Sequence, residues 1–180
     1  MRCREGAVRR KNMLVQNSNI KDIETIFSLY RAAVDYQRKN GYNLWPEFEC
    51  DLIEKEISEK RHYKITEGNE IACVFSIVYS DPIIWEEKDK EPSLYLHRIS
   101  TNPAFKGKGI MNLIKDWSVE HAKKNNKKFI RMDTWGDNEK LKEYYVSCGF
   151  VYTGQKHLPQ PTTLPQHYWG LTLSLFEIEV

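Results

Sequence analysis

The stretch Ile99–Met111, with the sequence ISTNPAFKGKGIM, most narrowly limits how this chain can fold. It predicts the end of a strand, a short loop with two glycines and the first turn of a helix. Another strand is predicted at 129–134, directly after that helix. Strands joined through a helix run parallel, and ligands of such sheets bind at the carboxyl ends of the strands. The stretch therefore predicts an α/β fold with a ligand site at this loop.

The rest of the chain predicts a single mixed α/β domain, with a central mixed sheet of about seven strands flanked by about four helices. Strands are expected at 11–17, 63–66, 71–79, 93–101, 129–134, 150–156 and 168–178, and helices at 20–39, 48–60, 108–125 and 137–149. Gly68-Asn69 predicts a hairpin turn between the second and third strands. The strand at 71–79 is apolar on both faces, so we expect it to be central.

Three local expectations depend on single residues or short segments. The first helix should bury a stripe formed by Ile20, Ile23, Phe27, Tyr30 and Val34. Asp137 is expected to cap the last helix, whose Leu141, Tyr144 and Tyr145 should face inward. Residues 81–92 are polar and are expected to form a loop.

Composition and charge limit the partners of the protein. The chain has 180 residues, 41% of them hydrophobic and 29% charged, which is typical of a globular domain. A net charge of +2 is too small to favour nucleic acid or an anionic membrane as the main partner. The longest apolar run is far shorter than a membrane span. Cys3, Cys50, Cys73 and Cys148 are scattered, which indicates neither a zinc site nor a disulfide framework and favours a cytoplasmic setting.

Residues 1–11 are predicted to be a flexible leader, and residues 12–180 to form the domain. The leader lacks the apolar core of a secretory signal. Its arginines leave open a targeting segment or a nucleic-acid-binding arm, which we consider the least favoured function for this chain.

The glycine loop has the chemistry of an anion site. Gly107 and Gly109 lack a Cβ, so an anion can approach the backbone closely. Amides from Gly107 to Met111 lie in or beside the first helical turn and can donate to a phosphate. Lys106 and Lys108 add positive charge. The alternative is a tight strand-to-helix connection that binds nothing.

Two blocks of sequence carry a resemblance to a known family. Lys106-Gly107-Lys108-Gly109-Ile110-Met111 resembles the pattern (Arg/Gln)-x-x-Gly-x-(Gly/Ala), and Asn138, Leu141, Tyr145 and Gly149-Phe150 resemble a second block, N-x-x-(A/L)-x-x-x-Y-x-x-x-G-F. Both belong to the GNAT superfamily of acetyl-CoA-dependent N-acetyltransferases, which the chain resembles from about Met13 to Val180. Lys106 and Met111 depart from the first pattern, which has Arg or Gln and a small residue there.

The resemblance implies an N-acetyltransferase with acetyl-CoA as cosubstrate and no metal. The acetyl group would move to a primary amine of a small molecule or peptide by direct attack on the thioester. The strand end from Ile99 to Thr101 would hold the pantetheine arm, and the loop from Lys106 to Met111, including Lys108 and Ile110, would hold the pyrophosphate. Asn138 is expected to contact CoA or simply to start its helix. The rival function is a non-catalytic acyl-CoA-binding or regulatory module of the same fold.

Several residues are candidates for the general acid and the general base of the reaction. Tyr145 is the expected acid toward the CoA sulfur, because a phenol stays protonated at neutral pH, although a core aromatic would occupy the same position. His97 is a candidate general base or a structural histidine. Asp133, Glu70 and His167 are weaker candidates for the base, and a chain of waters would serve as well.

The acceptor site is expected among aromatic segments. These are the segments 42–46, 81–85 and 168–169, which would line a pocket or cap the core. The acidic cluster Glu86, Glu87, Asp89 and Glu91 would attract a cationic amine or form a solvated charged loop. The sequence also leaves undecided whether the protein forms a homodimer that pairs through the last strand.

Overall fold

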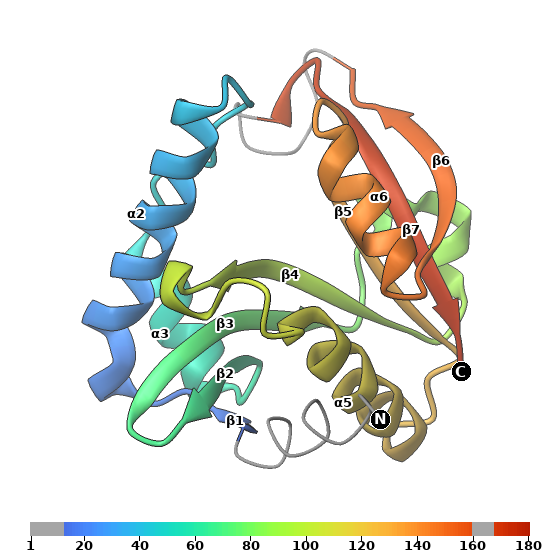
Figure 1. The fold of residues 1–180 in the computed structure, drawn as a ribbon. Helices are drawn as coiled ribbons and strands as arrows, with labels where there is room; N and C mark the ends of the chain where they lie inside the picture. The colour runs from blue at the N-terminus through green and yellow to red at the C-terminus, as the bar shows by residue number, and fades with distance from the viewer. Residues whose placement is uncertain (1–12, 160–167) are drawn as a thin grey trace, which may run out of the picture.

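A computed structural model describes residues 13–159 and 168–180, which form one seven-stranded sheet with helices on both faces (Figure 1). The strands are β1 (Met13–Asn17), β2 (His62–Glu67), β3 (Glu70–Val78), β4 (Ser93–Thr101), β5 (Phe129–Trp135), β6 (Val151–His157) and β7 (Thr172–Glu179). The α-helices are α2 (Ile23–Lys39), α3 (Cys50–Ser58), α4 (Pro82–Trp85), α5 (Ile110–Lys124) and α6 (Glu139–Ser147). Short 3₁₀ turns are η1 (Ile20–Asp22), η2 (Glu86–Lys90) and η3 (Pro103–Phe105).

The order of strands in the sheet is β1-β2-β3-β4-β5-β7-β6. Neighbouring strands are antiparallel except β4 and β5, which are parallel and joined through α5. This confirms the predicted strand–helix–strand unit and the mixed sheet. β3 lies between β2 and β4 with most of its residues buried, as its apolar sequence predicts. β7 is flanked by β5 and β6, so the last strand of the chain is not an edge of the sheet.

Each face of the sheet has its own hydrophobic core. On one face, Ile26 of α2 and Ile53 of α3 pack with Val74 of β3. On the other face, Ile114 of α5 packs with Phe75 of β3 in a larger core that extends to β5 and β7. Burying both faces is what a largely apolar central strand requires.

The segment 81–92 is not the loop that its polar sequence predicts. It contains α4 and η2, because Ile84 and Trp85 are buried beside Tyr95 and Leu173 in a third hydrophobic cluster. Pro82 stands in the first turn of α4, where a missing N–H costs no helical hydrogen bond.

Three further expectations are corrected. Ile20 is 58% exposed, because η1 precedes α2 and its tighter turn rotates Ile20 away from the buried stripe. Asn138, not Asp137, caps α6, since the Asn138 side chain accepts a hydrogen bond from the Leu141 amide. The last strand begins at Thr172, after Gly170 at φ +71°.

Among the described residues, no helix is both long and apolar enough to cross a membrane. The predicted leader, the first two residues of the predicted first strand, Cys3 and His167 lie outside the described residues.

A buried histidine joins α2 to the sheet edge. His62 of β2 is fully buried, and its ring nitrogens lie 2.8 Å from the Ser18 hydroxyl and 3.1 Å from the Tyr30 hydroxyl. Burial, and then the nearby Arg98 charge, lowers the pKa of His62 to about 4. The folded protein therefore holds this ring neutral.

We expect His62 to make stability depend on pH. In the unfolded chain its pKa returns to about 6.5, so its contribution is complete above pH 6.5 and is lost as the pH falls toward 4. The contribution of His62 to the free energy of unfolding is therefore smaller at pH 5 than above pH 6.5, by about 2 kcal/mol. Chemical denaturation of the protein and of His62→Gln at pH 7 and pH 5 measures it. Equal pH slopes for the two proteins would contradict the expectation.

Candidate active site

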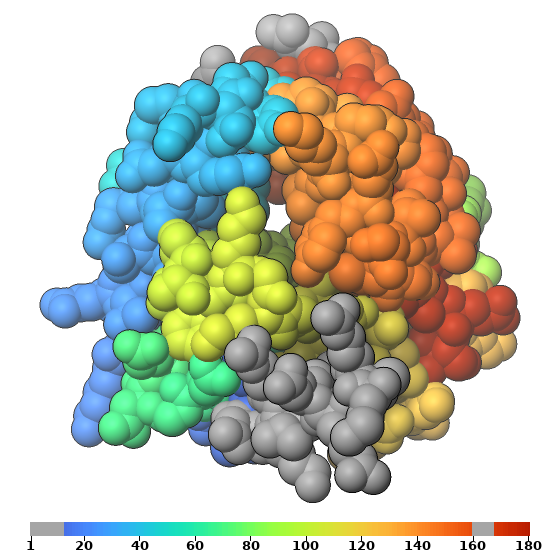
Figure 2. Space-filling view, viewed as in Figure 1, coloured from blue at the N-terminus to red at the C-terminus, as the bar shows by residue number. Residues whose placement is uncertain are grey.

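The site lies where two neighbouring strands separate. β4 and β5 pair only from Ser93–Phe129 to Leu96–Met132, and beyond that point their ends diverge. The space between them continues into a cavity of about 630 Å³, bounded by α2, α6 and the loop that precedes α5. Figure 2 shows the surface hollowed between these three segments. A cavity of this size is typical of small-molecule and cofactor sites.

A β-bulge turns the end of β4. Arg98 and Ile99 lie together opposite the single residue Phe75 of β3, and Arg98 has a φ of +50°. The Arg98 guanidinium pairs with the buried Glu56 carboxylate and donates to the Ser76 hydroxyl at 2.8 Å. Bulges bend a strand and interrupt its pairing. The strand end from Ile99 to Thr101 consequently lines the cavity instead of pairing with β5.

The glycine loop forms one end of the cavity. Gly107 and Gly109 have φ of +79° and +73°, and Gly109 is the N-cap of α5. A Cβ at either position would meet no atom within 4 Å, so the backbone conformation, and not crowding, favours glycine. The amides of the first turn of α5 have no partners inside the helix and can donate to an anion.

The two lysines of the loop are placed differently. Lys106 lines the cavity, with its ammonium 5.6 Å from the centre of the Tyr36 ring. Lys108 does not line it, because its ammonium pairs with Glu67 at 2.6 Å and lies over the Phe105 ring. The local positive charge that faces the cavity from this loop therefore comes from Lys106.

Tyr145 of α6 lies in the wall of the cavity and also packs in the core. Its ring contacts Phe176 edge-on at 5.4 Å and Phe150 at 6.4 Å between ring centres. Burial raises the pKa of Tyr145, with a smaller contribution from Tyr144 beside it. The phenol is thus protonated at neutral pH. Tyr144 also lines the cavity but is 44% exposed.

Asn138 and Asp137 join the N-terminus of α6 to the opposite wall. The Asn138 side chain caps the helix through the Leu141 amide at 3.0 Å, and the residue lines the cavity. The Asp137 carboxylate accepts from the Asn43 amide at 2.8 Å. This bond ties α6 to the segment after α2, from which Tyr42, Trp45 and Pro46 line the cavity.

The end of the cavity away from the glycine loop carries a cluster of three ionisable groups. His97 of β4 and Asp133 of β5 line the cavity, and Asp81 lies behind them with a carboxylate oxygen 3.5 Å from His97 Nε2. One atom from each lies within 4.8 Å of the others, a spacing that could also accommodate a metal ion. The pKa of Asp133 is raised to about 6, chiefly by burial. The Asp81 charge also raises this pKa, and the His97 charge lowers it. Because the resulting pKa lies below 7, the carboxylate is mostly ionised at neutral pH.

Other sequence-predicted candidates lie elsewhere. Glu70 is exposed at the start of β3 and does not line the cavity. Tyr168 lines it, whereas Trp85 belongs to the third hydrophobic cluster. The acidic segment is held in structural contacts: Glu86 with Lys156, Glu87 with Lys90, Asp89 with Ser80, and Glu91 with Arg131. These contacts favour a structural role for the acidic residues over attraction of a cationic amine.

Comparison with known proteins agrees with this geometry. The family model described as the acetyltransferase (GNAT) family matches residues 26–150. The chain belongs to the GNAT acetyltransferase family. It is 24% identical over 142 residues to the uncharacterized N-acetyltransferase YesJ of Bacillus subtilis (strain 168), covering 74% of this chain and 79% of that protein.

Solved structures show the same fold. A GNAT-family acetyltransferase from Listeria monocytogenes 4b F2365 superposes with a TM-score of 0.74 at 24% identity, over 93% of this chain and 95% of that one. The structure of yncA from Salmonella typhimurium, determined with its cofactor acetyl-CoA, has a TM-score of 0.66 at 16% identity, over 93% and 94% of the two chains.

Sequence reasoning missed two members of this GNAT site. Asp81 was placed in an aromatic segment, and no role was expected for Arg98 with its partner Glu56. The available signal was the position of two charged residues, Arg98 within a buried strand and Glu56 on the apolar side of a helix. Charged groups are rarely buried without a partner, so such positions indicate an ion pair. Their partners come from separate elements and could not be identified from spacing.

Met111 departs from the GNAT pattern without blocking the loop. Its side chain is 3% exposed and belongs to the core with Ile114 and Phe75. The residue contributes to the cavity lining at the start of α5, while its side chain fills the space below the helix. The larger residue thus serves packing.

We expect Met111→Ala to destabilise the domain by about 2–5 kcal/mol, because it leaves a void in a packed core. Leu52→Ala on α3 is the control, since Leu52 is 39% exposed and its loss should cost less than about 1 kcal/mol. Denaturant titration at pH 7 measures both. A smaller loss for Met111→Ala than for Leu52→Ala would show that the side chain is not packed as described.

Proposed function

We propose that this protein is an N-acetyltransferase that moves an acetyl group from acetyl-CoA to a primary amine of a small molecule or peptide, by direct attack of the amine on the thioester. The observation that carries the proposal is the continuous cavity opened by the separation of β4 and β5. It has an anion-binding loop at one end, Tyr145 in its wall and ionisable groups at the other end. Family membership supports acyl transfer as the reaction.

The cofactor would lie along the cavity from the loop to the strand ends. The loop amides and Lys106 would bind the pyrophosphate. Backbone groups from Ile99 to Thr101, released from strand pairing, would bind the pantetheine arm. Asn138 already uses its side-chain oxygen as a helix cap, so it would contact CoA through its remaining amide group or only position α6.

The chemistry needs a leaving thiolate to gain a proton and the amine to lose one. Tyr145, a protonated phenol in the wall of the cavity, would donate its proton to the CoA sulfur as the C–S bond breaks. The ammonium proton would pass to His97, the candidate general base. One N–C bond forms, one C–S bond breaks, and CoA leaves as the thiol.

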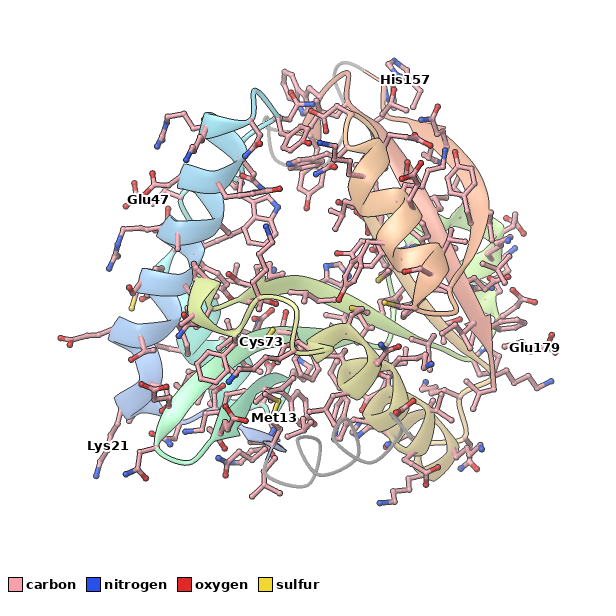
Figure 3. The ribbon with its side chains drawn as sticks, in the orientation of Figure 1. Met13, Lys21, Glu47, Cys73, His157 and Glu179 are labelled. Carbon is pink, nitrogen blue, oxygen red and sulfur yellow. The ribbon has the colours of Figure 1, made fainter. Side chains whose placement is uncertain are left out.

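Direct transfer is favoured over an acyl-cysteine intermediate. The described cysteines, Cys50, Cys73 and Cys148, do not line the cavity. Cys73 lies in the body of the molecule (Figure 3), and burial raises the pKa of its thiol to about 12. A thiol in that state is a poor nucleophile at neutral pH.

Replacing Tyr145 with phenylalanine tests the enzyme function. We expect kcat with a productive amine to fall about 100-fold, because the acid is lost while the ring still packs on Phe176. The affinity for CoA should stay within about twofold of the parent. Thiol release measures the rate, and Tyr152→Phe, a hydroxyl loss outside the cavity, is the matched control.

If the parent protein binds acetyl-CoA, turns over no amine in a broad panel and is unaffected by Tyr145→Phe, the protein is a non-catalytic acyl-CoA-binding module. A rate loss of similar size in Tyr152→Phe would instead show that the effect is structural.

The glycine loop gives a separate test of CoA binding. Gly109→Ala should weaken CoA binding by about tenfold, because the strained residue shifts the amides that face the pyrophosphate. Gly41→Ala is the control for strain alone, since Gly41 has φ +71° and similarly open space. Calorimetric titration with CoA compares them. Equal affinities of the two variants for CoA would show that the glycine loop does not bind CoA.

The remaining partner assignments stay predictions. These are the absence of a nucleic-acid or membrane partner, a cytoplasmic location, the absence of a metal, and a homodimer. A dimer formed by strand pairing would use β1 or β6, which are the edges of the sheet, since β7 is internal.

A further inference from the structure

Charged side chains of both signs line the cavity, among them Lys106, Lys140, Asp133 and Asp137. Lys106 faces the end where the glycine loop lies. The far end carries Asp133, with Asp81 behind it. Arg98 also lines this end, but its guanidinium is already paired with the buried Glu56 carboxylate. With that pair neutral, the far end has a net negative charge.

Asp133 faces the cavity and forms no ion pair with a lysine or arginine among the described residues. Its ionisable neighbours are His97 and Asp81, and its carboxylate accepts a hydrogen bond from its own backbone N–H. Beside it, Asp81 Oδ2 and His97 Nε2 are buried and lack hydrogen-bond partners among the described residues. The donors Arg98 Nε and Trp135 Nε1, which belong to cavity-lining residues, are also buried without partners there. Buried polar groups are normally paired, so this end is incomplete without a ligand that supplies positive charge and N–H donors.

The walls beside Asp133 are aromatic. Trp45 and Phe48 pack together on one side of the cavity, with 5.8 Å between ring centres. Trp135 and Tyr168 pack on the other side, at 5.4 Å. Such walls favour an apolar body and the positive charge attached to it.

We propose that the acceptor is a primary amine with an apolar body and no carboxylate, and that Asp133 holds its ammonium group. The proposal rests on the function proposed above. An ammonium supplies three N–H donors to the Asp133 and Asp81 carboxylates. A carboxylate on the same molecule would be repelled by Asp133 and Asp81, and the positive charge of Arg98 is already balanced by Glu56.

Matched pairs of amines test the proposal: phenethylamine with phenylalanine, and tryptamine with tryptophan. Each pair differs only in the carboxylate. We expect kcat/KM for the simple amine to exceed that for the amino acid by about 100-fold. Calorimetric titration of each compound into the CoA-loaded protein should show the same preference, whether or not turnover occurs. Equal values within the pairs, or binding of neither member, would overturn the proposal.

Substitutions at Asp133 test the contact. Asp133→Asn should raise the KM of the simple amine by about 30-fold or more with a smaller change in kcat, and Asp133→Glu should recover part of it. The affinity for CoA should not change. Asp51→Asn, an exposed carboxylate on α3, is the matched control, and thermal melting confirms that each variant folds. An unchanged KM in Asp133→Asn would overturn the assignment.

The outcomes separate the two proposals. If the simple amines bind through Asp133 but are never acetylated, the proposed function fails and the inferred binding preference stands. If amino acids are acetylated as well as simple amines, the function stands and the inference fails. Turnover that is lost in a chelator and restored by zinc would also overturn the inference, because a metal would then occupy the Asp133 carboxylate.

Discussion

The site depends on the point at which β4 and β5 stop pairing. Parallel strands normally continue their ladder, because each buried N–H and C=O needs a partner. Here the ladder ends at Leu96–Met132, and the bulge at Arg98–Ile99 turns the end of β4 away. The exposed strand end then offers backbone hydrogen bonds to a ligand. The same break that interrupts the sheet therefore creates its binding surface.

A buried ion pair holds this irregular strand in place. Arg98 has a backbone conformation that few non-glycine residues adopt, and its guanidinium reaches Glu56 on α3 and Ser76 on β3. Removing Glu56 would leave the Arg98 guanidinium buried without a counter-ion, which is costly, whereas Glu56 has a second cationic neighbour in Arg61 at 3.7 Å. The pair also neutralises a cation that would otherwise face the cavity. It thus links the shape of the site to its electrostatics.

The walls of the cavity come from distant parts of the chain. The bond between the Asn43 amide and Asp137 joins the segment after α2 to the start of α6, and the two segments meet above the hollow (Figure 2). Lys106 faces one end of that space and Asp133 the other. The two ends therefore differ in the sign of the charge that faces the cavity.

Local features of the site were largely predictable from sequence. The left-handed glycines before α5, the parallel crossover and the helix that carries Tyr145 follow from local spacing, because turns and helical periodicity are short-range properties. The helix cap moved by one residue, since Asp137 found a partner in a distant loop. Residues 81–92 formed helical turns because a tertiary core buries Ile84 and Trp85.

By itself the sequence determined the fold class, the position of the glycine loop before α5 and the place of Tyr145 on its helix. Only the tertiary structure decided that Lys106 and not Lys108 faces the cavity, that the Met111 side chain packs in the core, and that Asp81 and Asp133 gather around His97. The physical reason is that these outcomes depend on which partner each side chain meets. Such partners lie tens of residues away, where spacing along the chain carries no information about them.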